Sequence, residues 1–187
     1  MKKFDRIFDI TVHKSKETVM TQFINRMIRA AKLDVTLYEE VEADESAMKQ
    51  AMSVVILSSV ATGLGVTGVR GVFGFLIGLA VSLVVWFVWA YTVYIIGVKI
   101  LPEPQTRADH GQLLRTIGFS SVPRLFYIFG IIPGLITVIH PIISIWNIAA
   151  MIVAVRQALD YKSTMRAVAV CFIGWIIQGL LLLMLFG

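Results

Sequence analysis

The chain has a polar beginning and a long apolar remainder in which hydrophobic runs recur at membrane-spanning length. Each run is close to the roughly 20 residues that an α-helix needs to cross a hydrocarbon core of about 30 Å. Short stretches that contain charged residues, glycine or proline separate the runs. The pattern predicts five transmembrane helices, at about residues 51–69, 72–98, 113–132, 135–158 and 167–186.

An amphipathic helix is predicted before the first span, over residues 16–32. Ser15 can cap it, and Glu17 lies in its first turn, where a negative charge suits the helix dipole. At about 100° per residue, one half of this helix is apolar and the other carries Arg26, Arg29 and Lys32. Such a helix suits the surface of an anionic leaflet. Packing on the protein's own spans is the alternative, and the sequence leaves both open.

Acidic residues are concentrated between this helix and the first span. Nine of the twelve Asp and Glu residues lie at or before Glu45, and residues 38–45 form an acidic segment. It is either a recognition surface, for a basic partner or for the protein's own loops, or a solvated segment that starts a helix. The candidate interaction residues are Tyr38, Glu39, Glu42 and Asp44, together with Arg26, Arg29 and Lys32.

Composition and charge support a membrane protein with a defined orientation. At 57% hydrophobic and 16% charged residues, the chain is too apolar for a soluble domain. Its net charge of +5 comes from basic residues that border the spans, which does not indicate nucleic-acid binding. Nine of the seventeen Lys and Arg residues precede the first span. The positive-inside rule then predicts an inner-membrane protein with residues 1–50 cytoplasmic and the C-terminus outside.

The spans lack the groups that common intramembrane enzymes use. They contain no Asp or Glu, the three histidines lie far apart, and Cys171 is the only cysteine. Metal-dependent or aspartyl proteolysis and a carboxylate proton relay therefore lack their residues. The sequence predicts a non-enzymatic, all-α polytopic membrane protein without a cofactor, in contact with lipid and with a homo-oligomer or another membrane protein as candidate partner.

Arg124 is the charged residue that the span assignment places deep in the hydrocarbon. An unpaired cation there costs at least about 2.5 kcal/mol, so it is a candidate functional residue by default. Trp146 and Asn147 are its nearest predicted polar partners, and Arg156 is a further polar candidate in the same span. Alternatively, Pro123 breaks the helix, residues 109–122 lie at the interface, and Arg124 reaches the phosphate level.

Small residues in the second span offer a further pattern. Gly74, Gly78 and Ser82 recur at four-residue spacing on one helical face. Such a face allows another backbone to approach closely. Close packing within the chain and a homodimer seam are both compatible with it.

Several segments together resemble a prokaryotic member of the Yip domain family, which is related to the Ypt/Rab-interacting proteins. In chain order they are Arg29-Ala-Ala-Lys-Leu-Asp34, residues 38–44 leading into Ala47 and Ala51, Gly118-Phe119-xxx-Pro123, Trp146, residues 154–158 and Arg166-Ala167. The resemblance covers about residue 29 to the end. It implies a five-span helical bundle with a cytoplasmic N-terminal region. For the eukaryotic relatives it implies roles in vesicle traffic, membrane shaping and contact with prenylated small GTPases.

The leading hypothesis is a multi-pass protein of the Yip type that organises membrane or partner proteins through residues 16–45. The alternative is a small transporter, channel or lipid-handling protein with a polar cavity near Arg124.

Overall fold

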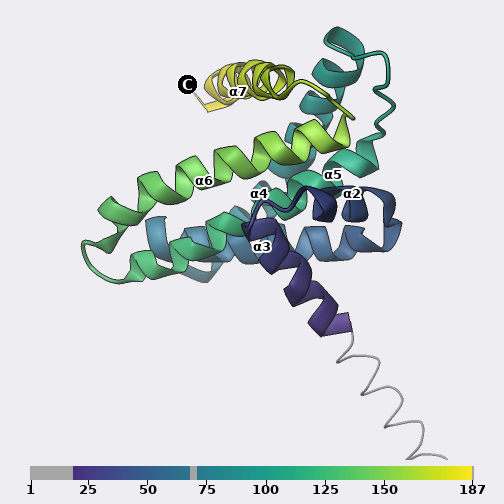
Figure 1. Ribbon diagram of the computed structural model, residues 1–187. Coiled ribbons are helices and arrows are strands. Elements are labelled where there is room, and N and C mark those ends of the chain that lie inside the picture. The colour runs from purple at the N-terminus through teal and green to yellow at the C-terminus, as the bar shows by residue number, and fades with distance from the viewer. Residues whose placement is uncertain (1–18, 68–70, 187) are drawn as a thin grey trace, which may run out of the picture.

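Helices make up every regular element in the described part of the chain. The structure, a computed structural model, describes residues 19–67 and 71–186. The all-α prediction is confirmed, and the predicted helix of residues 16–32 is present over residues 19–31, residues 16–18 lying outside the described range. We call residues 19–31 the amphipathic helix. The other elements are α2 (Val35–Ala43), η1 (Glu45–Ala47), α3 (Met48–Thr62), η2 (Gly63–Thr67), α4 (Gly71–Tyr94), η3 (Ile95–Ile100), α5 (His110–Ser120), η4 (Val122–Ile131), α6 (Leu135–Ala158) and α7 (Thr164–Phe186) (Figure 1).

Four helical stretches of the described chain are long and apolar enough to cross a membrane. They run over Glu45–Val66, Phe73–Ile100, Leu135–Ala158 and Thr164–Leu181. They correspond to four of the five predicted spans, which confirms the membrane class. The long second stretch ends in the π-helical turn η3, where the Tyr161 hydroxyl donates to the carbonyls of Gly97 and Leu101 at 2.9 and 2.7 Å.

The predicted third span is not one continuous helix. α5 ends at Ser120, and the 3₁₀-helical η4 begins at Val122 with Pro123 in its first turn. The two pieces rise about 16 Å and about 20 Å respectively, which together is enough to cross a hydrocarbon core. Their ends lie far apart in the fold, because α5 begins beside α2 and η4 ends beside Gly65 at the end of the first span. The predicted third span therefore consists of two helical segments.

α5 is buried inside the bundle. Residues 113–123 are all buried, and α5 contributes to both hydrophobic clusters of the core. Asp109 and Gln112 form a capping box at its start, each side chain binding the other residue's backbone N–H. This burial does not agree with the alternative in which residues 109–122 lie at the membrane surface.

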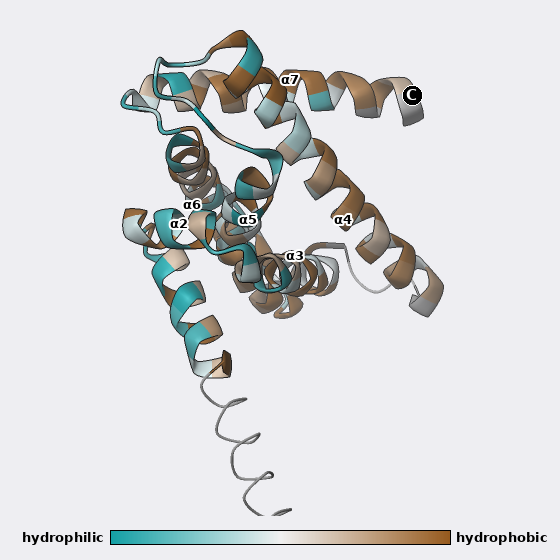
Figure 2. Ribbon diagram, turned by 90° about the vertical axis from the view of Figure 1, so that its right-hand side faces the viewer, coloured by the Kyte–Doolittle hydropathy of each residue, from teal (hydrophilic) through white to brown (hydrophobic). Residues whose placement is uncertain are grey.

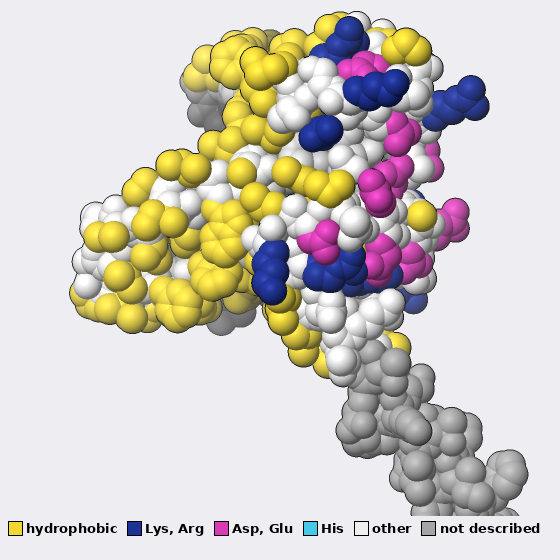
Figure 3. Space-filling model, in the orientation of Figure 1, with side chains coloured by type: hydrophobic (Ala, Val, Ile, Leu, Met, Phe, Trp, Pro, Cys, Tyr) yellow, Lys and Arg dark blue, Asp and Glu magenta, His cyan; other side chains and the backbone are white. Residues whose placement is uncertain are grey.

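Charged side chains gather at one end of the molecule. This polar end consists of α2, the start of α5 and the connections 101–109 and 159–163. In Figure 3 the Lys, Arg, Asp and Glu side chains lie on that side, and hydrophobic side chains cover much of the remaining visible surface. This separation is what a bundle embedded in lipid at one end and wet at the other requires.

α4 and α7 diverge from the packed group of α3, α5, η4 and α6. Figure 2 shows both helices running outward from that group. Large apolar side chains on the diverging parts are exposed, among them Phe73, Val84, Leu180 and Met184. At Gly78 on α4, an added Cβ would have no heavy atom within 4 Å. The close backbone approach expected at this glycine is therefore not present.

Gly118 is where α3 and α5 come closest, and its replacement by alanine is expected to destabilise the bundle. An added Cβ would lie 2.7 Å from the Cβ and 3.2 Å from the Cα of Ala51. Overpacking of this kind costs about 1–3 kcal/mol. We expect Gly118→Ala to lower the thermal midpoint measured by tryptophan fluorescence in detergent micelles. Gly78→Ala, which has open space, is the control, and equal midpoints for the two variants would contradict the prediction.

Candidate functional site

Two arginines of the amphipathic helix bind carboxylates of the acidic segment. Arg26 is 3% exposed, and its guanidinium reaches Glu40 at 2.8 Å, Asp44 at 2.7 Å and the side-chain oxygen of Gln50 at 2.8 Å. Arg29 pairs with Asp34 at 2.8 Å and with the second oxygen of Glu40 at 2.5 Å. Glu40 therefore bridges both arginines. This arrangement, which we call the arginine–carboxylate network, fastens the amphipathic helix to α2.

The network also fixes the charge of its acids. Hydrogen bonds from Arg29 and Thr36 lower the pKa of Asp34 to about 2. Hydrogen bonds from Ser46 and Arg26 likewise hold the pKa of Asp44 below its usual value. Both carboxylates are thus ionised at neutral pH and keep their partners bound.

The other predicted interaction residues have varied surroundings. Tyr38 is fully buried, and its hydroxyl has no hydrogen-bond partner among the described residues. Glu39 is exposed and accepts a hydrogen bond of 2.9 Å from Gln157, while Lys32 is exposed. Glu42 is partly buried. The structure thus brings Arg26, Arg29 and Asp44 into one network, whereas Glu39, Glu42 and Lys32 lie outside it and Tyr38 belongs to the core.

An apolar stripe on the amphipathic helix has no covering element among the described residues. It consists of Val19, Met20, Ile24 and Ile28, which are 45–58% exposed. Figure 3 shows hydrophobic side chains along the edge of this helix that borders the hydrophobic body. Beside the stripe, a groove of about 330 Å³ runs between the helix and η4, lined only by apolar residues such as Met27, Leu125 and Phe129. The helix thus has one face bound to α2 and an exposed apolar face that no described residue covers.

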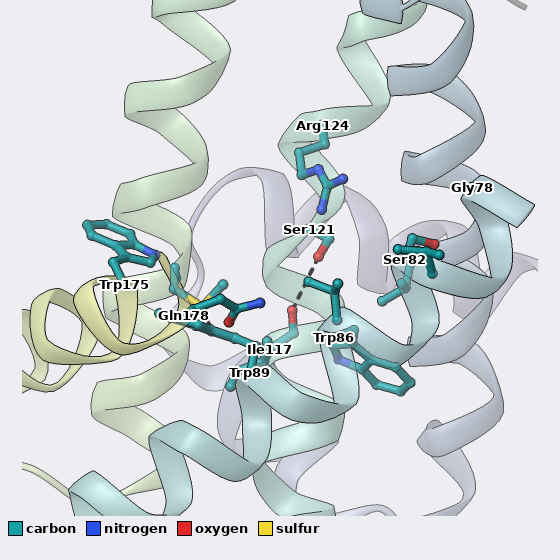
Figure 4. A pocket seen from close by; sticks show the side chains of 13 residues that line it. Gly78, Ser82, Trp86, Trp89, Ile117, Ser121, Arg124, Trp175 and Gln178 are labelled. Carbon is teal, nitrogen blue, oxygen red and sulfur yellow. Dashed lines mark hydrogen bonds between the residues drawn. The ribbon is translucent and has the colours of Figure 1, made fainter. Parts of the chain in front are cut away.

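A second cavity lies where α4 and α7 diverge, and Arg124 points into it. Its volume is about 390 Å³, and α3, α4, α5, η4, α6 and α7 all contribute to its lining. Figure 4 shows the Arg124 guanidinium directed from η4 toward Ser121 and the interior of the cavity. Among the described residues, the Arg124 side chain has no hydrogen-bond or ion-pair partner. The polar cavity predicted around Arg124 has a counterpart here.

The predicted partners of Arg124 lie elsewhere. The Trp146 indole donates a hydrogen bond of 2.9 Å to the carbonyl of Ala31, so it holds the end of the amphipathic helix. Asn147 does not line the Arg124 cavity. Arg156 donates to the carbonyls of Tyr161 and Lys162 at the polar end. The sequence placed Trp146 and Asn147 near Arg124 by depth alone, and in the structure Trp146 is directed to Ala31 instead.

Comparison of the sequence with known protein families identifies one family. A family model described as Yip1 domain matches residues 38–186, which is most of the chain. The chain belongs to the Yip1 domain family. The resemblance inferred from the sequence is thereby confirmed, and with four apolar helices of spanning length it makes the chain a multi-pass membrane protein of the Yip type. No match was found among curated proteins or among solved structures.

The Yip1 match begins at Tyr38, after the amphipathic helix. The carboxylates Glu40 and Asp44 lie inside the matched region, and Arg26 and Arg29 lie before it. The network therefore joins the Yip1 domain to a segment outside it.

Sequence reasoning missed Arg115, which connects α5 to α2. Its guanidinium donates to the carbonyl of Val41 at 2.9 Å and to that of Glu42. These carbonyls belong to the last turn of α2, where no intrahelical N–H is left to bind them. Arg115 lies more than 70 residues from these carbonyls in the chain, so the sequence carried no local signal for this contact.

Among the described residues, no three His, Cys, Asp or Glu are placed to hold a metal ion.

Removal of Arg26 is expected to release the amphipathic helix from α2. Arg26→Ala leaves Asp44 and the Gln50 amide without their arginine partner and leaves Glu40 with Arg29 alone, for which we expect a loss of about 2 kcal/mol in unfolding free energy. Protease cleavage within residues 19–31 should then accelerate in the full-length protein. Lys32→Ala is the control, because exposed substitutions usually change stability by less than about 0.5 kcal/mol. Equal cleavage rates in both variants would refute the role of the network.

Glu42 is expected to make stability depend on pH. Burial raises the pKa of its carboxyl to about 7, and the negative charge of Asp160 acts in the same direction. Since the folded pKa lies above the unfolded one, the stability that Glu42 contributes is complete in acid and is lost as pH rises through about 7. Glu42→Gln should raise the free energy of unfolding, measured by denaturant titration, by about 1–2 kcal/mol at pH 8 and leave it unchanged at pH 4. Glu45→Gln, at an exposed position, is the control, and a stabilisation of equal size at both pH values would exclude the titration.

Proposed function

We propose that this Yip1 domain protein is a non-enzymatic membrane organiser that inserts the amphipathic helix into one leaflet as a fixed wedge. The observation that supports it most is the two-sidedness of this helix. The apolar stripe is exposed, while Arg26 on another face is buried in ion pairs with α2. A helix that is free on its apolar side and anchored on its charged side suits shallow insertion into the acyl boundary.

The anchoring residues distinguish this proposal from simple attraction to anionic lipid. Arg26 and Arg29 neutralise Asp34, Glu40 and Asp44 and are not free to bind phosphates. Lipid contact therefore depends on the apolar stripe. Burial of its four half-exposed side chains contributes roughly 3–6 kcal/mol, counting about 1.5–3 kcal/mol for each fully buried one.

A rigid connection gives the insertion a mechanical consequence. Because Arg26 joins α2 and Trp146 of α6 binds the carbonyl of Ala31, the helix is held at two points. A wedge fixed to a bundle adds area to one leaflet only, and one-sided insertion favours a curved bilayer. The apolar groove beside η4 leaves room for acyl chains under the helix.

Orientation and location follow from the charges at the polar end. Arg156, Lys162 and Arg166 lie there together with the network, and the positive-inside rule favours the cytoplasm for such an end. We therefore infer an inner-membrane protein whose amphipathic helix lies in the cytoplasmic leaflet.

Protein partners would meet the acidic side of the same end. Glu39, Glu45, Asp109 and Asp160 are all exposed there. These side chains favour a basic segment of a membrane protein or of a second copy. Such a contact would add a protein partner to the proposed organiser role, but membrane insertion of the amphipathic helix does not require it.

Vesicle shape tests the wedge directly. We expect the full-length protein, reconstituted in liposomes, to reduce vesicle diameter or draw tubules as the protein-to-lipid ratio rises, measured by electron cryomicroscopy. The double variant Ile24→Asp/Ile28→Asp should leave vesicles at the diameter of protein-free liposomes, because buried carboxylates cannot replace the apolar contacts.

The matched control is Gln22→Asp/Asn25→Asp, which adds the same two charges at exposed polar positions of the same helix. This variant should remodel vesicles as the unmodified protein does. Remodelling by the stripe variant equal to that of the control, or none by the unmodified protein, would refute the proposal.

A further inference from the structure

No counter-ion pairs with Arg124 among the described residues. No Asp or Glu lies between residues 46 and 102, between 110 and 159 or after Asp160, so none of the surrounding α3, α4, α5, η4, α6 and α7 carries a carboxylate that could pair with it. A cation held in an apolar surrounding favours an anion from outside the chain strongly, because the low local dielectric strengthens the attraction.

Other groups around Arg124 also favour an anion. The buried indole N–H of Trp86 has no acceptor among the described residues, and Trp86 lines the cavity. Gln178 also lines it, and the buried side-chain oxygen of Gln178 has no donor among the described residues. The hydroxyls of Ser82 and Ser121 donate to the carbonyls of Leu79 and Ile117 and carry no charge. Figure 4 shows these side chains around one space. The cavity therefore offers hydrogen-bond donors and a positive charge, but no negative one.

The cavity opens on the apolar side surface of the bundle. Val81 on α4 and Trp175 on α7 line it and are also 50% and 40% exposed. Beyond them, the diverging parts of the two helices expose further apolar residues, including Ile77 and Ile176. A molecule that reaches Arg124 by this route comes from the lipid and leaves an acyl chain against α4 and α7.

We propose that this cavity binds the phosphate or carboxylate headgroup of a single bilayer amphiphile. Arg124 forms the ion pair with the headgroup, and the indole N–H of Trp86 donates a further hydrogen bond. The acyl chain lies outside, between α4 and α7. A volume of about 390 Å³ is within the usual range of small-molecule sites and suits a compact headgroup.

Apolar walls favour an amphiphile over a free anion. Val55, Val85 and Ile117 line the cavity beside the polar groups. A soluble phosphate would lose its hydration on entering the cavity and gain only the ion pair with Arg124. An amphiphile gains the same ion pair and also buries its acyl chain against apolar side chains.

Tryptophan quenching provides a test, since Trp86, Trp89 and Trp175 all line the cavity. Full-length protein in detergent micelles is titrated with phosphatidic acid that carries brominated acyl chains, and with the matching brominated phosphatidylcholine. We expect quenching by phosphatidic acid at lower concentration. Arg124→Leu should weaken this preference about tenfold or more, and Arg124→Lys should retain part of it.

Two further variants keep the outcome decisive if Arg124→Leu fails to fold. Gly78→Phe fills the cavity from a position with open space, and it should abolish the preference without a loss of thermal stability. Arg107→Leu removes an exposed cation outside the cavity and should preserve the preference. Equal quenching by the two lipids in the unmodified protein, or a preference unchanged in Gly78→Phe, would overturn the proposal.

Inorganic phosphate distinguishes the two sources of the anion. Millimolar phosphate should not displace brominated phosphatidic acid, because it lacks the acyl contact. Full displacement would identify a site for a free anion and refute the amphiphile.

Discussion

The break between α5 and η4 is the constraint on which the rest of the structure depends. Inside a membrane bundle every backbone polar group needs a partner, and Pro123 has no N–H to continue an α-helix. The chain turns into a 3₁₀-helix instead, with the Ser121 N–H donating to Gly118 and the Arg124 N–H donating to Ser121. Because η4 is the narrower kind of helix, its Gly130 can lie against the backbone of Gly65. The same turn directs the Arg124 side chain away from the axis of η4 and into the cavity.

α5 connects the break at Pro123 to the polar end of the molecule. Gly118 sets its distance from α3, and Arg115 binds the last carbonyls of α2. α2 in turn presents Glu40 and Asp44 to Arg26. One buried helix thus positions the acids that hold the amphipathic helix. Since each step depends on the one before it, a disturbance of α5 should affect the polar end and the interior of the bundle together.

The sequence predicted the parts that local patterns determine. The lengths of the apolar runs predicted the four long apolar helices. The order of the six segments that resemble the Yip domain family predicted the family that the Yip1 match confirms. Pro123 and Arg124 were noticed, but whether the helix bends, breaks or leaves the bundle depends on what packs around it. Gly78 looked like a contact residue because its spacing suits one, yet α4 diverges there. Trp146 lies at a suitable depth for Arg124 but donates its hydrogen bond to Ala31. The sequence could not show this, because a helix that is apolar on all sides gives little indication of how it is rotated about its axis.

The surroundings of the Arg124 cavity favour a binding site over a transport path. The buried cluster that includes Trp89, Val93, Leu113 and Ile117 lies between the cavity and the polar end. No residue of the connections 101–109 or 159–163 lines the cavity, so the lining offers no continuous polar route to that end. A solute could not pass without moving this cluster, whereas an amphiphile needs only the side opening at Val81 and Trp175. An occupant held there would also fill the space between α4 and α7 and connect the diverging helices to the packed group. Lipid binding and the organisation of the membrane by this protein are therefore physically compatible, because the cavity and the groove beside the amphipathic helix are lined by different residues and share only η4.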